Sequence, residues 1–222
     1  DMKRLLNRFF LPLLCLLFAG TLSVAAASDV KAPDALVKDV TNEVLEIVRA
    51  DKAIQAGDTK RVIALVDAKV LPHFDFRRMT MLAVGRDWRQ ASPEQQGKLT
   101  DAFRTLLVRT YSNALTQYRD QRIVFPLSRF AAADTRVQIR SEVIQTGAQP
   151  VGIDYMLEKS EQGWKVFDVI VAGVSLVTNY RSSFGQEISR GGIDGLIKSL
   201  EDRNRSLAEQ HGLQQGEGGR GA

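Results

Sequence analysis

The front of the chain, from residue 33 to residue 118, carries apolar residues at the three- and four-residue spacing of amphipathic helices. One stripe runs from Val37 to Val48, and Gly57 provides a stop after it. A second, shorter stripe follows over residues 58–72. The pattern therefore predicts a helical first half.

The best-marked of these helices is expected to begin at Ser92. Serine is favoured at this position because its hydroxyl accepts a hydrogen bond from the first helical turn. Pro93 suits that turn, and Gln95 stands where the capping box requires it. From Leu99 to Tyr118 the apolar positions keep the helical spacing.

Between residues 121 and 172 the apolar spacing falls to two, which is typical of strands with one dry and one wet face. From Val137 to Val143, apolar residues alternate with polar ones, and the pattern resumes after a turn at residues 147–150. Pro126 places the first strand at an edge of the sheet. The short connections predict an antiparallel meander.

Helical spacing returns over residues 174–210, with a break at Gly191 and Gly192. Residues 211–222 contain five glycines and little apolar material, so we expect a disordered tail there. Helices, an antiparallel sheet and further helices together predict an α+β fold, as a single domain over residues 28–210.

The first 27 residues have the three parts of a secretory signal peptide. Basic residues precede an apolar run from Phe9 to Ala19, and the small residues from Ala25 to Ala27 form a cleavage site. A retained membrane anchor is the alternative, but eleven residues span about 16 Å as a helix, against a hydrocarbon core of about 30 Å. We therefore expect export and cleavage after Ala27.

Removal of this segment changes the meaning of the composition. The whole chain of 222 residues has a net charge of +4, but 27 basic and 25 acidic residues remain without the signal peptide. This small excess does not favour a nucleic-acid partner. The single cysteine, Cys15, also lies in the signal peptide, which leaves neither a thiol nucleophile nor a disulfide framework.

The sequence lacks the common catalytic and cofactor motifs. It has no HExxH helix, no GxSxG elbow and no Walker loop. His73 has no titrating partner nearby in sequence, so a packed or capping histidine is favoured over a catalytic base. Asp168 lies in an otherwise apolar strand and must be hydrogen-bonded or paired, which favours an anchor to a helix N-terminus or an arginine over a general base. We predict no catalytic residue, no metal site and no cofactor.

The apolar faces of the sheet and of the helices leave one question open. A sheet with one dry face can close against helices as a solid core, or it can curve and leave a cavity. Met79, Met81 and Leu82 form an apolar cluster before Gly85, and methionine side chains adapt to flexible ligands. The pattern alone does not decide between core and cavity.

Two strings near the end of the domain carry a resemblance. They are WKVFDVIVAGVSLVTNYRSSF over residues 164–184 and GIDGLI over residues 192–197. Three upstream runs, over residues 73–76, 85–88 and 103–111, fit the same pattern in the same order. The chain resembles the MlaC family, the periplasmic phospholipid carriers also called toluene-tolerance auxiliary proteins.

The resemblance covers the chain from Ala32 to Arg203. It implies an NTF2-like fold, in which a curved antiparallel sheet of about four strands packs with a helical subdomain and encloses an apolar pocket for lipid tails. It also implies a periplasmic protein that carries phospholipid between an outer-membrane lipoprotein–porin complex and an inner-membrane ABC transporter with an MCE-domain ring. This transport would maintain the lipid asymmetry of the outer membrane.

The dry sheet face and the helices that face it supply the candidate lipid-binding residues, and ordinary core packing is the alternative for each. From the sheet they are Val137, Ile139, Val143, Ile153, Tyr155, Leu157 and Val166, and from the helical parts Leu82, Phe103, Leu107, Tyr111, Val174 and Tyr180. Four arginines, Arg77, Arg78, Arg86 and Arg89, are candidates for contact with a phosphate head group or an acidic partner surface. A solvated face is their alternative.

Three classes of function stay open. The first is a lipid-binding carrier. The second is an NTF2-like enzyme that uses Asp168 and His73 as an acid–base pair, and the third is an adaptor that bridges membrane complexes without binding lipid. The carrier requires a cavity, the enzyme requires its two residues to meet, and the adaptor predicts a closed core.

Overall fold

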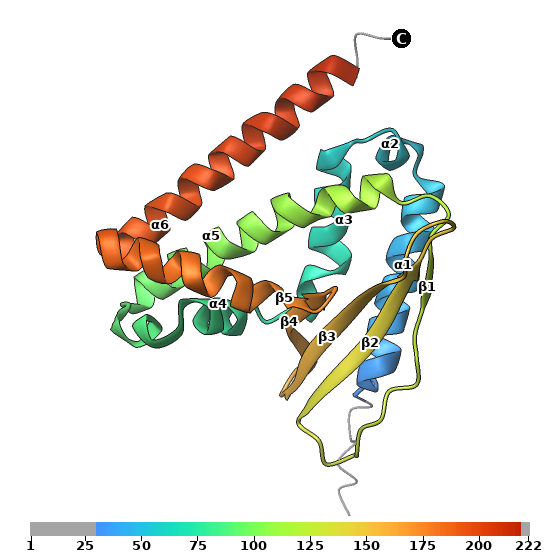
Figure 1. The fold of residues 1–222 in the computed structure, drawn as a ribbon, viewed down its shortest axis with the longest axis horizontal. Coiled ribbons are helices and arrows are strands. Elements are labelled where there is room, and N and C mark those ends of the chain that lie inside the picture. The colour runs from blue at the N-terminus through green and yellow to red at the C-terminus, as the bar shows by residue number, and fades with distance from the viewer. Residues whose placement is uncertain (1–29, 219–222) are drawn as a thin grey trace, which may run out of the picture.

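The structure, a computed structural model, describes residues 30–218, apart from the side chains of residue 211 and residues 213–218. The predicted signal peptide, residues 1–27, lies outside the described residues. A twisted antiparallel sheet carries α1 along one face, while α4 and the first part of α6 lie at the other end of the molecule and α5 runs from there towards α2 and α3 (Figure 1). The predicted α+β architecture is confirmed.

Five helices precede the sheet, as the helical spacing of the first half predicts. They are α1 (Pro33–Ala50), α2 (Lys52–Gln55), α3 (Thr59–Lys69), α4 (Phe76–Val84) and α5 (Pro93–Tyr111), joined by the 3₁₀ turns η1 (Leu71–His73), η2 (Gly85–Gln90) and η3 (Ser112–Gln117). The capping box of α5 is present: Gln95 N donates to Ser92 Oγ at 3.1 Å, and Ser92 N donates to Gln95 Oε1 at 2.9 Å. The start of α5 is therefore fixed by local sequence.

The described chain forms one five-stranded antiparallel sheet in the order β1-β2-β3-β4-β5. Its strands are β1 (Arg122–Val124), β2 (Arg136–Ile144), β3 (Val151–Ser160), β4 (Gly163–Val171) and β5 (Val174–Ser175). The expectation of about four strands missed β5, because two residues are too few to show a period. β1 ends just before Pro126, which cannot donate to a ladder.

A β-bulge changes the direction of side chains in β4. Leu157 pairs with Val166 and Met156 pairs with Asp168, so Phe167 has no partner opposite it on β3. Val166 and Val169 consequently face the same side of the sheet although they are three residues apart. A bulge also bends its strand and increases the local twist of the sheet.

The last element, α6 (Leu176–Gly218), consists of two helical segments divided at Gly192. Gly192 has φ 68° and ψ −168°, a conformation that only glycine adopts readily, which confirms the predicted break. The helix then continues to Gly218, and the disordered tail expected over residues 211–222 stays a prediction. Leucine, glutamine and glutamate dominate residues 213–217, and these are good helix formers.

Two differently built regions result. The buried side chains of α4, η2, α5 and α6 form one cluster, which we call the helical core: Met79, Ala83, Val84, Trp88, Leu99, Ala102, Phe103, Leu106, Leu107, Val177, Phe184, Leu196, Ile197 and Leu200. Two further clusters of buried apolar side chains lie between α1, α2, α3 and the inner face of the sheet. Within residues 30–218, no helix combines the length and the apolar character needed to span a membrane.

Candidate functional site

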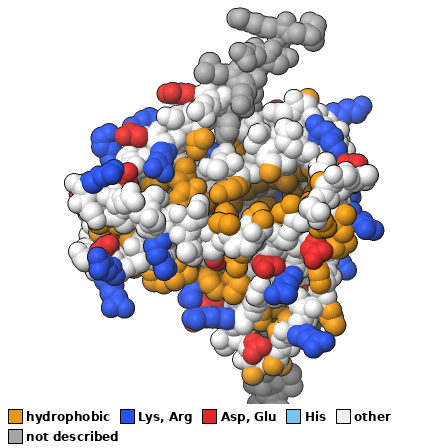
Figure 2. All heavy atoms as spheres, viewed as in Figure 1, with side chains coloured by type: hydrophobic (Ala, Val, Ile, Leu, Met, Phe, Trp, Pro, Cys, Tyr) orange, Lys and Arg blue, Asp and Glu red, His pale blue; other side chains and the backbone are white. Residues whose placement is uncertain are grey.

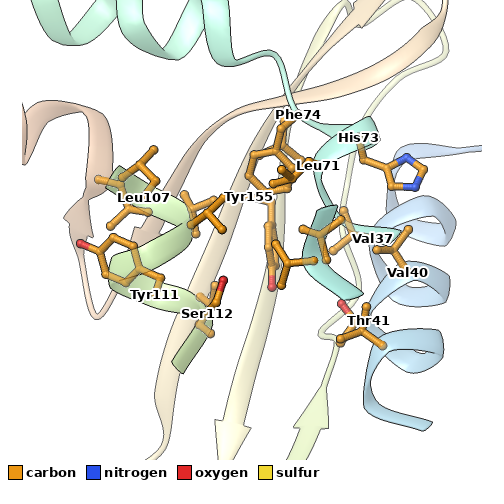
Figure 3. A pocket seen from close by; sticks show the side chains of 18 of the residues that line it. Val37, Val40, Thr41, Leu71, His73, Phe74, Leu107, Tyr111, Ser112 and Tyr155 are labelled. Carbon is orange, nitrogen blue, oxygen red and sulfur yellow. The ribbon is translucent and has the colours of Figure 1, made fainter. Parts of the chain in front are cut away.

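A cavity of about 380 Å³ lies between the inner face of the sheet and the helices α1, α3 and α5 (Figure 3). The helical parts that line it are Leu36, Val37, Val40, Thr41, Val44, Leu45, Val66, Val70, Leu71, His73, Phe74, Phe76, Met79, Leu107, Val108, Tyr111, Ser112, Leu115 and Leu176. The sheet supplies Ile123, Ile153, Tyr155, Val166, Val169 and Val171. The volume of the cavity falls in the usual range of small-molecule binding sites.

The lining contains no lysine, arginine, aspartate or glutamate. Its polar atoms belong to Thr41, His73, Tyr111, Ser112 and Tyr155. Burial raises the pKa of the Tyr155 phenol, against the opposing effect of the nearby Ser141 and Thr41 hydroxyls, so Tyr155 stays neutral. Such a surface makes dispersion contacts with an apolar ligand and has no charged side chain to pair with a charged group.

Several apolar side chains remain exposed at the ends of the elements that form the cavity. Tyr111, at the end of α5, is 41% exposed although it lines the cavity. Val151, at the start of β3, and Val174, at the start of β5, are also exposed, and Gly152 O accepts a hydrogen bond from Ala172 N in the turn between β4 and β5. Figure 2 shows hydrophobic side chains gathered across the middle of one face, with charged side chains around its edge.

Five of the thirteen predicted lipid-binding residues line this cavity. They are Leu107, Tyr111, Ile153, Tyr155 and Val166. Tyr155 stands in the centre of the close view, between Val37 on α1 and Leu107 on α5 (Figure 3). The structure thus brings the predicted faces of α5 and of the sheet together around one space.

The other eight lie elsewhere. Phe103 is fully buried in the helical core, and Leu82 and Tyr180 pack against it. Val137, Ile139 and Leu157 are buried in the cluster that α1 shares with the sheet, while Val143 is half-buried and Val174 is 56% exposed. The dry face of the sheet is therefore divided: α1 packs on β2, while β3, β4 and Ile123 of β1 face the cavity.

Many lining residues come from α1, α3 and η1, and none of these is among the predicted lipid-binding residues. Their signal was present, since residues 37–48 and 58–72 carry helical apolar stripes. Nothing in those stripes distinguished a side chain that faces a cavity from one that packs against another helix.

The comparison with known proteins decides the family. The family model described as MlaC protein matches residues 38–202. This chain belongs to the MlaC family. The matched residues include most of the cavity lining on α1, α3, α5 and the sheet.

Named relatives of this MlaC chain come from three bacteria. It is 24% identical over 173 residues to the intermembrane phospholipid transport system binding protein MlaC of Haemophilus influenzae. The matched region covers 77% of this chain and 81% of that protein. It is 27% identical over 190 residues to the toluene tolerance protein ttg2D of Pseudomonas putida, covering 85% and 86%. A phospholipid-binding protein from Ralstonia solanacearum, solved in complex with a phospholipid, is 42% identical, with a TM-score of 0.76 over 80% of this chain and 99% of that one.

Asp168 anchors a helix in this MlaC fold. Its carboxylate accepts hydrogen bonds from Ser175 Oγ at 2.6 Å and from Val177 N at 3.2 Å, in the first turn of α6, and from Val169 N at 2.9 Å. Through its pairing with Met156, Asp168 belongs to the sheet face opposite Tyr155. The preferred interpretation of this acid, an anchor to a helix N-terminus, is confirmed.

His73 lies at the edge of the cavity, with its ring turned away from Tyr155 (Figure 3). Burial, together with the charges of Lys165 and Lys31, lowers the pKa of the imidazole below its usual value, so His73 is neutral at neutral pH. Neither a hydrogen bond nor an ion pair joins His73 to Asp168. The structure does not assemble the acid–base pair of the enzyme hypothesis.

None of the four candidate arginines lines the cavity. Arg77 donates to Gln96 Oε1 at 2.6 Å and lies over the Trp88 ring, with 5.3 Å from its guanidinium carbon to the ring centroid. Arg78 pairs with Glu158 at 2.5 Å. Arg86 and Arg89 are exposed. Contact with a partner surface stays a prediction for these arginines, since the cavity itself contains none of them.

Proposed function

We propose that this protein binds a phospholipid and carries it between two membranes, with an acyl chain of the lipid held in the cavity. The observation that carries the proposal is an uncharged apolar cavity of about 380 Å³ between the sheet and α1, α3 and α5. A relative that is 42% identical over nearly its whole length was solved in complex with a phospholipid. The apolar cavity and the phospholipid bound to this relative both support a lipid as the ligand.

The energetics of lipid transfer explain why a carrier needs such a cavity. Two acyl chains of about 16 carbons gain roughly 25 kcal/mol on leaving water, at about 0.8 kcal/mol per CH₂. This exceeds the ceiling of non-covalent affinity, about 20 kcal/mol, so the useful comparison is between bilayer and cavity. A cavity that solvates the chains nearly as well as a bilayer makes the exchange nearly neutral, and no catalytic residue is required.

The proposed setting is the periplasm, reached by export with the predicted signal peptide. There the protein would receive or deliver phospholipid at an outer-membrane lipoprotein–porin complex and at an inner-membrane ABC transporter with an MCE-domain ring, and so maintain outer-membrane asymmetry. The Haemophilus relative, named as a binding protein of an intermembrane phospholipid transport system, supports this setting. With a neutral exchange, direction would come from ATP hydrolysis in the partner.

The structure gives less support to the two other classes. An adaptor without ligand predicts a closed core, whereas this fold encloses an apolar cavity. An enzyme that uses His73 and Asp168 would need them to meet, and the hydrogen-bonding capacity of Asp168 is directed to the start of α6.

The test is mass spectrometry of lipid extracted from purified protein, for the natural sequence and for Ile153→Glu. Ile153 lines the cavity from β3 and is half-buried. The natural protein should yield about one phospholipid per chain. Ile153→Glu should yield at least tenfold less, because an unpaired carboxylate among lipid tails is strongly unfavourable.

Ile144→Glu is the matched control, since Ile144 lies on the opposite sheet face and pairs with Arg122. It adds the same charge outside the cavity and should keep its lipid. Lipid-free natural protein in repeated preparations would contradict the proposed function. Retention of lipid by a folded Ile153→Glu variant would contradict the assignment of the cavity.

A further inference from the structure

A second hollow, of about 430 Å³, adjoins the cavity. It is lined by Val30, Lys31, Leu36, His73, Glu161, Gln162, Gly163, Trp164 and Lys165, which come from the chain before α1, from α1 and η1, and from the hairpin between β3 and β4. Leu36 and His73 line both spaces. The two spaces therefore adjoin at these two side chains.

The second hollow differs from the cavity in charge. Lys31 and Lys165 line it from different elements, and Glu161, exposed at the hairpin, is the one acid in its lining. Lys165 Nζ donates to Pro72 O at 2.7 Å, which holds the ammonium beside η1. Lys31 Nζ pairs with Asp39 at 2.6 Å, and both side chains are about half exposed. The lining of this hollow has a net positive charge, whereas the cavity has none.

His73 lies at the junction, and its electrostatics show that both lysines act there. The charges of Lys165 and Lys31 add to the effect of burial in lowering the pKa of the imidazole, and Glu43 opposes them weakly. Two ammonium groups thus lie near the place where the apolar cavity meets the second hollow. A phospholipid has the matching arrangement, with a phosphate next to its acyl chains.

We propose that the second hollow holds the phosphate of the bound phospholipid between Lys31 and Lys165, with an acyl chain passing Leu36 and His73 into the cavity. This inference rests on the proposed function and adds the position and chemistry of the head group. Ammonium–phosphate hydrogen bonds are charge-assisted. Lys31 can leave its ion pair with the exposed Asp39 and bind the phosphate at little cost, because exposed ion pairs contribute little to stability. The four candidate arginines line neither space, so these lysines replace them as head-group contacts.

The test compares two soluble lipids with the same tails, dioctanoyl-phosphatidylethanolamine and dioctanoylglycerol, by calorimetric titration of lipid-free protein. The variant K31M/K165M removes both ammonium groups and keeps side chains of similar length. It should bind the phospholipid about tenfold more weakly and should bind dioctanoylglycerol, which has no phosphate, unchanged. The control K52M/K60M changes two exposed lysines outside both hollows and should leave both affinities unchanged.

The outcomes separate this inference from the proposed function. If the natural protein binds neither lipid, the proposed function fails. If it binds both and K31M/K165M binds them as the natural protein does, or loses affinity for both equally, the head-group site is wrong while the cavity stands. Millimolar inorganic phosphate should not displace the phospholipid, because it has no tails; displacement would identify a site for free phosphate and overturn the inference.

Discussion

Phe103 and Phe184 fill the helical core from α5 and α6, whereas the side chains around the cavity leave a space between them. The two rings meet edge to face with centroids 5.1 Å apart, and Tyr180 packs against both. Valine is the most frequent residue in the cavity wall, where α1, α3 and β4 supply, among others, Val40, Val66 and Val169. These short side chains do not fill the space between the sheet and the helices.

The comparison shows how one chain can hold a packed core next to a cavity. In the helical core, complete packing gives stability, because removal of buried atoms leaves a void that the surroundings fill only in part. Around the cavity, side chains already border empty space and lack some of these contacts. The same kind of substitution should therefore have different effects in the two regions.

The largest expected effect is that of Phe103→Ala. Phe103 is completely buried, so its truncation should lower the free energy of unfolding by about 3–5 kcal/mol. Val40→Ala, in the cavity wall, should cost about 1 kcal/mol or less, because Val40 is half-buried and borders the cavity. Denaturant unfolding of the lipid-free proteins measures both values. Equal losses would mean that the cavity wall is packed as tightly as the helical core.

This contrast also explains why the fold was more predictable than the site. The capping box at Ser92, the break at Gly192 and the strand alternation from Val137 to Val143 each act within a few residues of sequence. Their signals are local, so the elements could be predicted from them. The end of the helix from Leu176 has a weaker local signal, because glycines alternate with helix formers between residues 212 and 218.

The lining of the cavity depends on distances between elements, which periodicity does not contain. Phe103 and Leu107 lie on one stripe of α5, yet Phe103 fills the helical core and Leu107 reaches the cavity. Leu157 and Tyr155 share one face of β3, but Leu157 is buried in the cluster that includes Val37 of α1, while Tyr155 lines the cavity. The family resemblance implied a pocket, and the packing of α1 determined which residues line it.

Enlarging side chains should reverse the contrast. Ala83 is completely buried in the helical core, so Ala83→Leu should destabilise the fold by about 1–3 kcal/mol through overpacking. Val40→Phe should leave stability unchanged or raise it, because the ring enters an existing space, and it should reduce lipid content severalfold. Unfolding and lipid extraction of the same preparations check both effects. Normal lipid content in a stable Val40→Phe protein would mean that tails do not occupy this part of the cavity.

A smaller effect is expected where the two regions are joined. Asp168 extends from the sheet to the first turn of α6, a helix that packs in the helical core. Asp168→Asn removes the negative charge at the helix N-terminus and one acceptor, and should lower the free energy of unfolding by about 1–2 kcal/mol. Because the acid lies on the face opposite Tyr155, the lipid content of the folded protein should stay the same. Loss of lipid from a stable variant would show that the carboxylate also shapes the cavity.

The smallest effect concerns Tyr180, which packs in the helical core next to Tyr111 of the cavity. Burial, and then the neighbouring Tyr111, raises the pKa of the Tyr180 phenol from 10.0 to about 12. The folded state favours the neutral phenol, so this stabilisation is complete below pH 10 and is lost as the pH rises through 12. Tyr180 is only partly buried, which reduces the effect to about 1 kcal/mol. Phenylalanine does not titrate. In denaturant unfolding, the free energy of unfolding of the natural protein, relative to that of Tyr180→Phe, should therefore fall by about 1 kcal/mol from pH 9 to pH 12. A constant difference over this range would mean that water reaches Tyr180 from the cavity and that the boundary between the two regions is open there.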